Sequence, residues 1–294
     1  MSPRRVLVDL AAVSVLSLTS ACTPPAPAVV HAAATSEPTA SPSPSPSPSP
    51  SPSPAADPEP VVPPGFSLDA PPPVVNNGPR TADVVALTFD ADMTTGMLAK
   101  LANGQARSYA NLKVIEILEQ QQVAATFFLT GMWVEHYPDV TRRLAANPAF
   151  ELANHTWSHR AYTANCYTLM TVPAAEMASE ITRTFDIIRP FGGHQTNYFR
   201  FPGLCYNAAA LSAIAPTHVT VIQGDVVSAD PGATSAAPIV RNVLTKAQPG
   251  SIVVLHITED NARMTDEALP DILAGLRAKG LRPVRLSELL ATAT

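Results

Sequence analysis

The stretch VVALTFDAD spans residues 84–92. Its first six residues are apolar or β-branched, which is typical of a strand buried on both faces of a parallel sheet. Two carboxylates, Asp90 and Asp92, follow this run directly. Active sites of parallel α/β folds lie at the carboxyl ends of the strands. The stretch therefore predicts the fold class and also one edge of a functional site.

Strand and helix patterns alternate through the rest of the chain. Apolar runs predict further strands at 123–129, 151–154, 198–201, 219–222, 252–255 and 283–286. Helical spacing of apolar residues predicts helices at 112–121, 140–146, 174–188 and 269–279. This alternation implies parallel strands joined by right-handed crossovers. We therefore predict an α/β domain over residues 81–294, built as a barrel or as an open doubly wound sheet.

Polar side chains recur where the predicted strands end. Besides the two aspartates they are His155, His159, Arg200, Asp225, Asp230 and His256. The histidines of the segment HTWSH are four residues apart, so on a helical turn they face the same way, as a divalent cation requires. An oxygen ligand and an open position would complete a catalytic metal site. Asp90 and Asp92 are the candidate sources of that oxygen.

The N-terminal residues 1–22 are typical of an export signal. Arg4 and Arg5 precede an apolar run at 10–18 that is too short to span a bilayer. The small residues before Cys22 resemble a bacterial lipobox. We therefore expect an exported protein that is lipid-anchored at Cys22, faces the cell wall and contacts the membrane only through that anchor. The alternative is cleavage near Ala21 and secretion.

Residues 23–80 form a Pro- and Ser-rich linker. An uninterrupted Ser-Pro repeat occupies residues 41–54. Proline fixes φ and removes a backbone donor, so this repeat predicts an extended spacer. At about 3.1 Å per residue it reaches on the order of 40 Å. Such a spacer would hold the folded domain away from the membrane.

The remaining composition narrows the function classes. The net charge of -5 argues against nucleic-acid binding, which needs a basic face. Cys166 and Cys205 are the two cysteines left if Cys22 carries lipid, and an oxidising compartment would allow them to form a disulfide. Two buried free thiols are the alternative. We expect a monomer.

Five segments in order resemble the polysaccharide deacetylases of the NodB-homology type, carbohydrate esterase family four. They are TFDAD at 88–92, HTWSH at 155–159, FRFPG at 199–203, the segment 225–230, and Leu255-His256. ATFFLTG at 125–131 is similar to the family's second strand. The resemblance covers residues 82–290. It implies a distorted (β/α) barrel and a divalent metal cofactor, zinc or a similar ion such as cobalt.

The resemblance also implies a role for each matching residue. Asp90 matches the general base, Arg200 the arginine that orients it, and His256 the general acid. Asp230 matches the carboxylate that tunes that acid. His155 and His159 match the two metal-binding histidines. The backbone N–H of Gly203, which follows Pro202, is a candidate oxyanion donor.

The chain departs from the family pattern at Ala91, where an aspartate usually binds the metal. Our hypothesis is that Asp92 supplies this oxygen instead, which we expect to require a bend of the chain after Asp90. The alternative is a metal held by two histidines and water. Pro231 is a second departure, at a position where the family often has tryptophan in the substrate groove.

These features predict removal of N-acetyl groups from peptidoglycan or a chitin-like polymer. One alternative is hydrolysis of O-acetyl esters, such as those of xylan. Another is a non-catalytic wall-binding lipoprotein, in which Ala91 marks lost chemistry. Asp90 and His256 count against the latter, because a binding module needs neither a base nor an acid.

Overall fold

The computed structural model describes residues 70–291. The predicted signal peptide, the lipidation at Cys22 and most of the linker lie outside these residues. Within them, nine parallel strands form one sheet in the order β1-β6-β5-β4-β3-β2-β8-β7, with β9 also paired to β2. The strands are β1 (Val74–Val75), β2 (Val84–Ala91), β3 (Ala125–Leu129), β4 (Phe150–Asn154), β5 (Gln195–Phe199), β6 (Thr220–Ile222), β7 (Val226–Val227), β8 (Ile252–His256) and β9 (Arg282–Val284).

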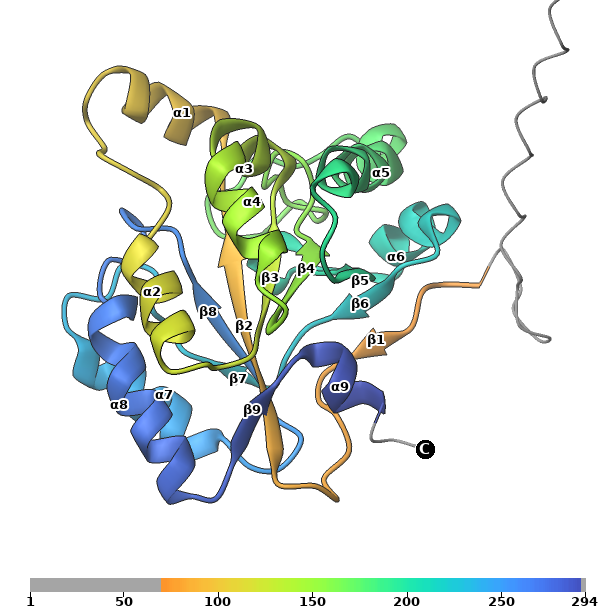
Figure 1. Ribbon diagram of the computed structural model, residues 1–294. Helices are drawn as coiled ribbons and strands as arrows, with labels where there is room; N and C mark the ends of the chain where they lie inside the picture. Colours follow the sequence, from red (N-terminus) through yellow and green to blue (C-terminus); the bar gives the residue numbers. More distant parts are fainter. Residues whose placement is uncertain (1–69, 292–294) are drawn as a thin grey trace, which may run out of the picture. The chain divides into compact units, whose positions relative to one another are not determined.

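Helices connect the strands and cover the outside of the curled sheet (Figure 1). They are α1 (Thr95–Ala102), α2 (Leu112–Gln120), α3 (Gly131–His136), α4 (Pro138–Ala146), α5 (Met177–Ile188), α6 (Ala208–Ile214), α7 (Ala236–Lys246), α8 (Thr265–Ala278) and α9 (Leu286–Ala291). The end strands β1 and β7 are not paired to each other in the described sheet. The architecture is therefore the predicted distorted (β/α) barrel.

Strand β2 occupies the middle of the sheet and is buried along its whole length. Side chains of a strand alternate between its two faces. Leu87, Phe89 and Ala91 belong to the large apolar cluster, in which Phe89 stacks on Phe127 with ring centroids 5.5 Å apart. The other face of β2 ends in Asp90. One strand thus anchors the core on one face and presents a carboxylate on the other.

The folded part begins earlier than we predicted. Val74 of β1 pairs with Val221 of β6, and the N–H of Gly78 donates to the carbonyl of Gly250 at 2.8 Å. These residues fall inside the predicted linker 23–80, so that boundary is wrong. Sequence patterns also missed α1, α3, α6, α7, β1 and β7. Over residues 70–291, no helix combines the length and apolar character that crossing a membrane requires.

Candidate active site

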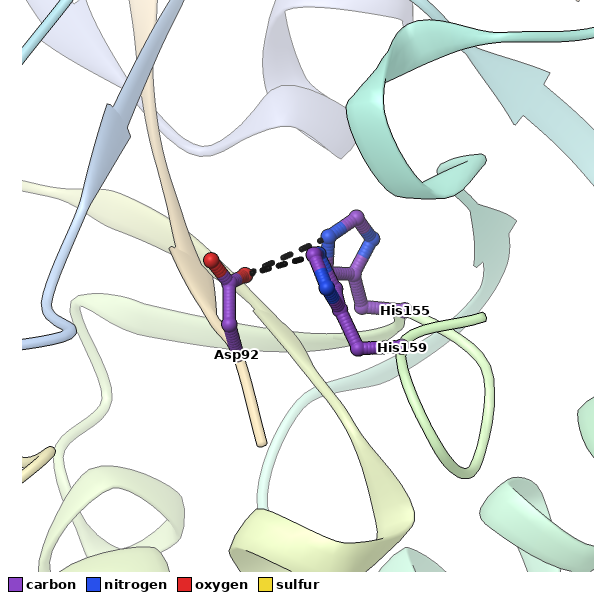
Figure 2. A group of neighbouring side chains, drawn as sticks. All are labelled: Asp92, His155 and His159. Carbon is purple, nitrogen blue, oxygen red and sulfur yellow. Dashed lines mark ion pairs between the residues drawn. The ribbon is translucent and has the colours of Figure 1, made fainter. Parts of the chain in front are cut away.

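The parallel strands bring three of the predicted site residues together at their carboxyl ends. Asp92 follows β2, and His155 and His159 follow β4. Oδ1 of Asp92 lies 3.5 Å from Nε2 of His155 and 3.2 Å from Nε2 of His159. Figure 2 shows the carboxylate facing both imidazole rings. All three side chains are buried or nearly so.

These three residues fit a divalent cation. Oδ1 of Asp92 is buried and has no hydrogen-bond partner among the described residues. In a tetrahedral zinc site with bonds of about 2.0–2.1 Å, neighbouring ligand atoms lie about 3.3 Å apart. The distances from Asp92 Oδ1 to the two histidine nitrogens, 3.5 and 3.2 Å, match this spacing. Three protein ligands leave a further position open, as catalytic metal sites require.

Each ligand is held in a form suited to a metal. Nδ1–H of His155 donates to the carbonyl of Arg200 at 2.9 Å, which leaves Nε2 facing the cluster. Burial lowers the pKa of His159 to about 4, with Asp92 opposing the shift, so the ring is neutral at pH 7. Burial alone would raise the pKa of Asp92, but the adjacent histidines hold it well below its usual range.

Asp92 reaches the cluster without the bend that we expected after Asp90. β2 continues through Ala91, so Asp90 and Asp92 are two residues apart on an extended chain and share a face. Their carboxylates lie 3.7 and 3.5 Å from Nε2 of His155. The N–H of Asp92 donates to Oγ1 of Thr258 at 3.0 Å, a contact that the sequence did not predict. The predicted bend is wrong, although the predicted neighbours of Asp92 are the observed ones.

Arg200 holds Asp90 from the side opposite the histidines. Its Nη1 donates to Oδ1 of Asp90 at 2.7 Å, and its Nε donates to the carbonyl of Ile222 at 3.2 Å. The guanidinium also stacks over the ring of Phe128 at 4.0 Å. This leaves Oδ2 of Asp90 directed towards His155. Arg200 therefore contacts Asp90 through its side chain and His155 through its carbonyl.

His256 and Asp230 form a second buried pair at the end of β8. Nδ1 of His256 lies 2.8 Å from Oδ1 of Asp230, while Thr265 and Ser228 each donate a hydroxyl to Asp230 at 2.7 Å. Burial lowers the pKa of His256, but Asp230 outweighs it and raises that pKa to about 10. Nε2 of His256 lies 4.0 Å from Oδ2 of Asp92. A protonated imidazole thus stands beside the cluster.

The predicted disulfide between Cys166 and Cys205 is present. Gly203, two residues before Cys205, has a φ of +62°. A Cβ at this position would lie 2.8 Å from Sγ of Cys166 and 3.0 Å from the ring of Tyr167, so only glycine fits here. The role of its N–H as an oxyanion donor stays a prediction.

A groove of about 590 Å³ opens beside His159. This volume suits a small-molecule or sugar-sized ligand. Its lining combines apolar and charged side chains and includes Met97, Lys100, Met132, Trp157, Arg160, Met170 and Glu180. The groove therefore reaches the cluster at His159.

Some residues of the site region were missed by sequence patterns, and one predicted neighbour lies elsewhere. Thr258 and Glu180 contact the aspartate and histidine segments but have no spacing relation to them in the sequence. Asp225, within the 225–230 segment, instead pairs with Arg80 at 2.7 Å and accepts from the N–H of Ile252. Asp225 therefore supports the fold.

Comparisons with known proteins identify the family. The model of the polysaccharide deacetylase family matches residues 77–222. The peptidoglycan-N-acetylglucosamine deacetylase of Bacillus cereus is 29% identical over 217 residues, which are 74% of this chain and 71% of that protein. The chitooligosaccharide deacetylase of Rhizobium leguminosarum bv. trifolii is 32% identical over 185 residues, 61% of this chain and 75% of that protein.

Solved structures give the same result. A crystal structure of a peptidoglycan N-acetylglucosamine deacetylase superposes with a TM-score of 0.61 at 28% identity, covering 74% of this chain and 92% of that one. A family 4 acetyl xylan esterase from Clostridium thermocellum, in complex with cobalt, superposes with a TM-score of 0.56 at 25% identity, covering 71% and 91%. The chain therefore belongs to the polysaccharide deacetylase family.

Proposed function

We propose that this protein is a metal-dependent deacetylase that removes N-acetyl groups from a cell-wall polysaccharide. The observation that carries the proposal is the Asp92, His155 and His159 cluster, with Asp90 and His256 beside it. Family membership supports a hydrolase that acts on acetylated sugars. Hydrolysis of an amide needs a base, an acid and a charge stabiliser, and candidates for all three stand in this site.

The residues suit the following roles. A divalent cation bound at the cluster would lower the pKa of a water molecule and polarise the acetyl carbonyl. Asp90, fixed by Arg200, accepts the proton of the attacking water through Oδ2. His256 donates a proton from Nε2 to the departing amine, because Asp230 occupies its Nδ1. The N–H of Gly203 is the proposed second donor to the oxyanion.

Peptidoglycan is the substrate that we favour, and chitin-like oligomers are the related alternative. The similar proteins of Bacillus cereus and Rhizobium support this choice, because both are named as deacetylases of N-acetylated sugars. An O-acetyl esterase is the second candidate, since an acetyl xylan esterase has the same fold.

Release of acetate tests the proposal. Purified protein would be incubated with peptidoglycan, chitin oligomers and acetyl-xylan, before and after chelation and with zinc or cobalt restored. We expect release from the N-acetylated polymers that stops on chelation and returns with metal. Release from acetyl-xylan alone would favour the esterase. No release from any substrate with zinc or cobalt present would overturn the proposal that the protein is an enzyme.

We propose further that the protein is exported and anchored by lipid at Cys22. The Cys166–Cys205 disulfide supports an oxidising compartment, and relatives act on wall polymers. Metabolic labelling with a fatty-acid analogue tests the anchor. Wild-type protein should be labelled and remain with the membrane, whereas Cys22→Ser should be unlabelled. An unlabelled wild-type protein in the medium would mean secretion after cleavage.

A further inference from the structure

The loop that carries the two metal-site histidines has an unusual backbone. Thr156 has a φ of +68° and His159 a φ of +53°, both in the left-handed region. A non-glycine residue is uncommon there, and a β-branched residue such as threonine is a true outlier. Such a conformation persists only where the surrounding structure imposes it. The contacts around residues 155–159 therefore determine where the imidazoles point.

One carboxylate oxygen accepts four hydrogen bonds from the loop at residues 155–159. Oε2 of Glu180, in the first turn of α5, accepts from the hydroxyls of Thr156 and Ser158 at 2.9 and 2.8 Å. The same oxygen accepts from the backbone N–H groups of Trp157 and Ser158 at 3.2 and 2.9 Å. Hydrogen bonds to a charged acceptor are roughly twice as strong as neutral ones. Glu180 thus ties three consecutive residues between the histidines to α5.

The opposite side of the loop is fixed by helix α3. The N–H groups of Gly131 and Met132 donate to the carbonyls of Thr156 and Trp157, each at 3.0 Å. A Cβ at Gly131 would lie 2.1 Å from the ring of Trp157, so the close approach requires glycine. The carbonyls of Thr156 and Trp157 therefore face α3, while the N–H groups of Trp157 and Ser158 face Glu180. Without Glu180, the N–H groups of Trp157 and Ser158 would lose their carboxylate acceptor. We refer to the contacts of the loop with α3 and Glu180 as the clamp.

Helix α5 is a firm support for this clamp. Asn154, at the end of β4, donates to the carbonyl of Ile181 at 2.8 Å and accepts from the N–H of Thr156 at 2.9 Å. Arg183, one turn after Glu180, stacks over the ring of Trp157 at 3.4 Å. The carboxylate, the carbonyl and the guanidinium come from one helical surface and all act on residues 154–158.

We propose that Glu180 is a positioning residue, which holds the loop in its left-handed conformation and so presets the distance from Asp92 to both histidines. The inference rests on the proposed metal site. Glu180 is not one of the three cluster residues; its hydrogen bonds go to the loop, and its side chain also lines the groove beside His159. Outer groups that orient metal ligands typically contribute 10- to 100-fold to metal affinity.

Zinc titration of the metal-free full-length protein by calorimetry tests this role. We expect Glu180→Ala to raise the zinc Kd about 10- to 100-fold. Glu180→Gln should give an intermediate Kd, because its amide oxygen still accepts from the backbone but carries no charge. Asp186→Asn is the matched control, since it removes an exposed carboxylate from the same helix. Its Kd should equal that of the wild-type protein.

The outcomes separate this inference from the proposed function. If wild-type protein binds no zinc, the metal site itself is wrong. If both Glu180 variants bind zinc with the same Kd as the wild-type protein, Glu180 has no positioning role. If Glu180→Ala does not fold, Glu180→Gln decides, and a Kd equal to that of Asp186→Asn overturns the inference. In folded Glu180→Ala saturated with zinc, KM should stay near the wild-type value, whereas a raised KM alone would mean that Glu180 contacts the substrate.

Discussion

Arg200 and Asp90 form an ion pair with a 2.7 Å hydrogen bond, and neither side chain is more than 4% exposed. Removing one partner of a buried pair leaves an uncompensated charge, which typically costs about 3–5 kcal/mol. We expect Arg200→Met to lower the free energy of unfolding by that amount and to abolish acetate release, because Asp90 loses its orientation. Urea denaturation of the metal-free protein measures the first effect.

Arg189→Met provides the comparison for this prediction. Arg189 pairs with Asp186 at 3.0 Å, but both side chains are well exposed. Exposed pairs contribute about 0–1 kcal/mol, so this variant should unfold almost like the wild type. If the two arginine variants lost the same free energy of unfolding, the burial of the Arg200–Asp90 pair would not explain its contribution.

Asp92→Ala should weaken metal binding sharply. Asp92 is the only carboxylate among the three cluster residues, and its loss leaves only the two imidazoles to hold a metal. We expect the zinc Kd to rise more than about 100-fold, beyond the range for groups that only orient ligands. Calorimetry measures the change, with exposed Asp139→Asn as the control. Unchanged affinity in Asp92→Ala would favour a metal held by two histidines and water.

The His256–Asp230 pair predicts how stability depends on pH. The pKa of His256 is about 10 in the folded protein, above its ordinary value of 6.5. The pair's stabilisation is therefore fully present below pH 6.5 and is lost as the pH rises towards 10. In metal-free protein, the free energy of unfolding should fall across this window, and less steeply in Asp230→Asn.

Urea denaturation at several pH values tests that slope. Asp225→Asn is the control, because Asp225 is largely buried but pairs with Arg80 rather than with a histidine. Its curve should run parallel to that of the wild type at lower stability. A parallel curve for Asp230→Asn as well would show that Asp230 does not raise the pKa of His256.

The Cys166–Cys205 disulfide closes a loop across 39 residues of sequence. The chain-entropy model gives about 4 kcal/mol for a loop of this length. The Cys166→Ala and Cys205→Ala double variant should lose that free energy of unfolding, and dithiothreitol should then have no further effect. A double variant as stable as the oxidised wild type would contradict the prediction.

Gly203→Ala should disturb both stability and turnover. Its φ of +62° costs an L-residue about 1–2 kcal/mol, and the new methyl would press on Cys166 and Tyr167. Gly104→Ala isolates the backbone effect, since Gly104 has a φ of +67° and nothing within 4 Å of a Cβ. We expect a larger loss of stability for Gly203→Ala and a lower kcat only there. Equal effects of the two substitutions would remove the steric argument.

The sequence was most informative where one strand or helix has one continuous pattern. β2, β4 and β8 lie within two residues of their predicted positions and α5 within three, because each buries an apolar run or stripe. β5 was predicted too late, at 198–201, because its residues Gln195 to Asn197 are polar and partly exposed. Helix α6 is mostly alanine and gives no clear apolar stripe, whereas α7 was missed although it buries Ile239 and Val243 four residues apart.

The site was predictable for residues that stand at strand ends. Thr258 and Glu180 were not, because they contact the site segments across the fold rather than along the chain. The expected bend after Asp90 was wrong for a related reason. We expected the chain to bend between Asp90 and Asp92. Instead β2 stays extended through Ala91, and the N–H of Asp92 then donates to Thr258.

Side chains of β2 alternate between the two faces of the sheet, so the strand is sensitive to any shift in register. Its odd-numbered residues, from Val85 to Ala91, fill the core, and the even-numbered ones become polar towards the site. Inserting or deleting one residue before Asp90 would turn both carboxylates into the apolar layer and place apolar side chains beside the histidines. A two-residue change would keep each set on its own face. A one-residue insertion or deletion in this strand would therefore disrupt the apolar core and the site at the same time.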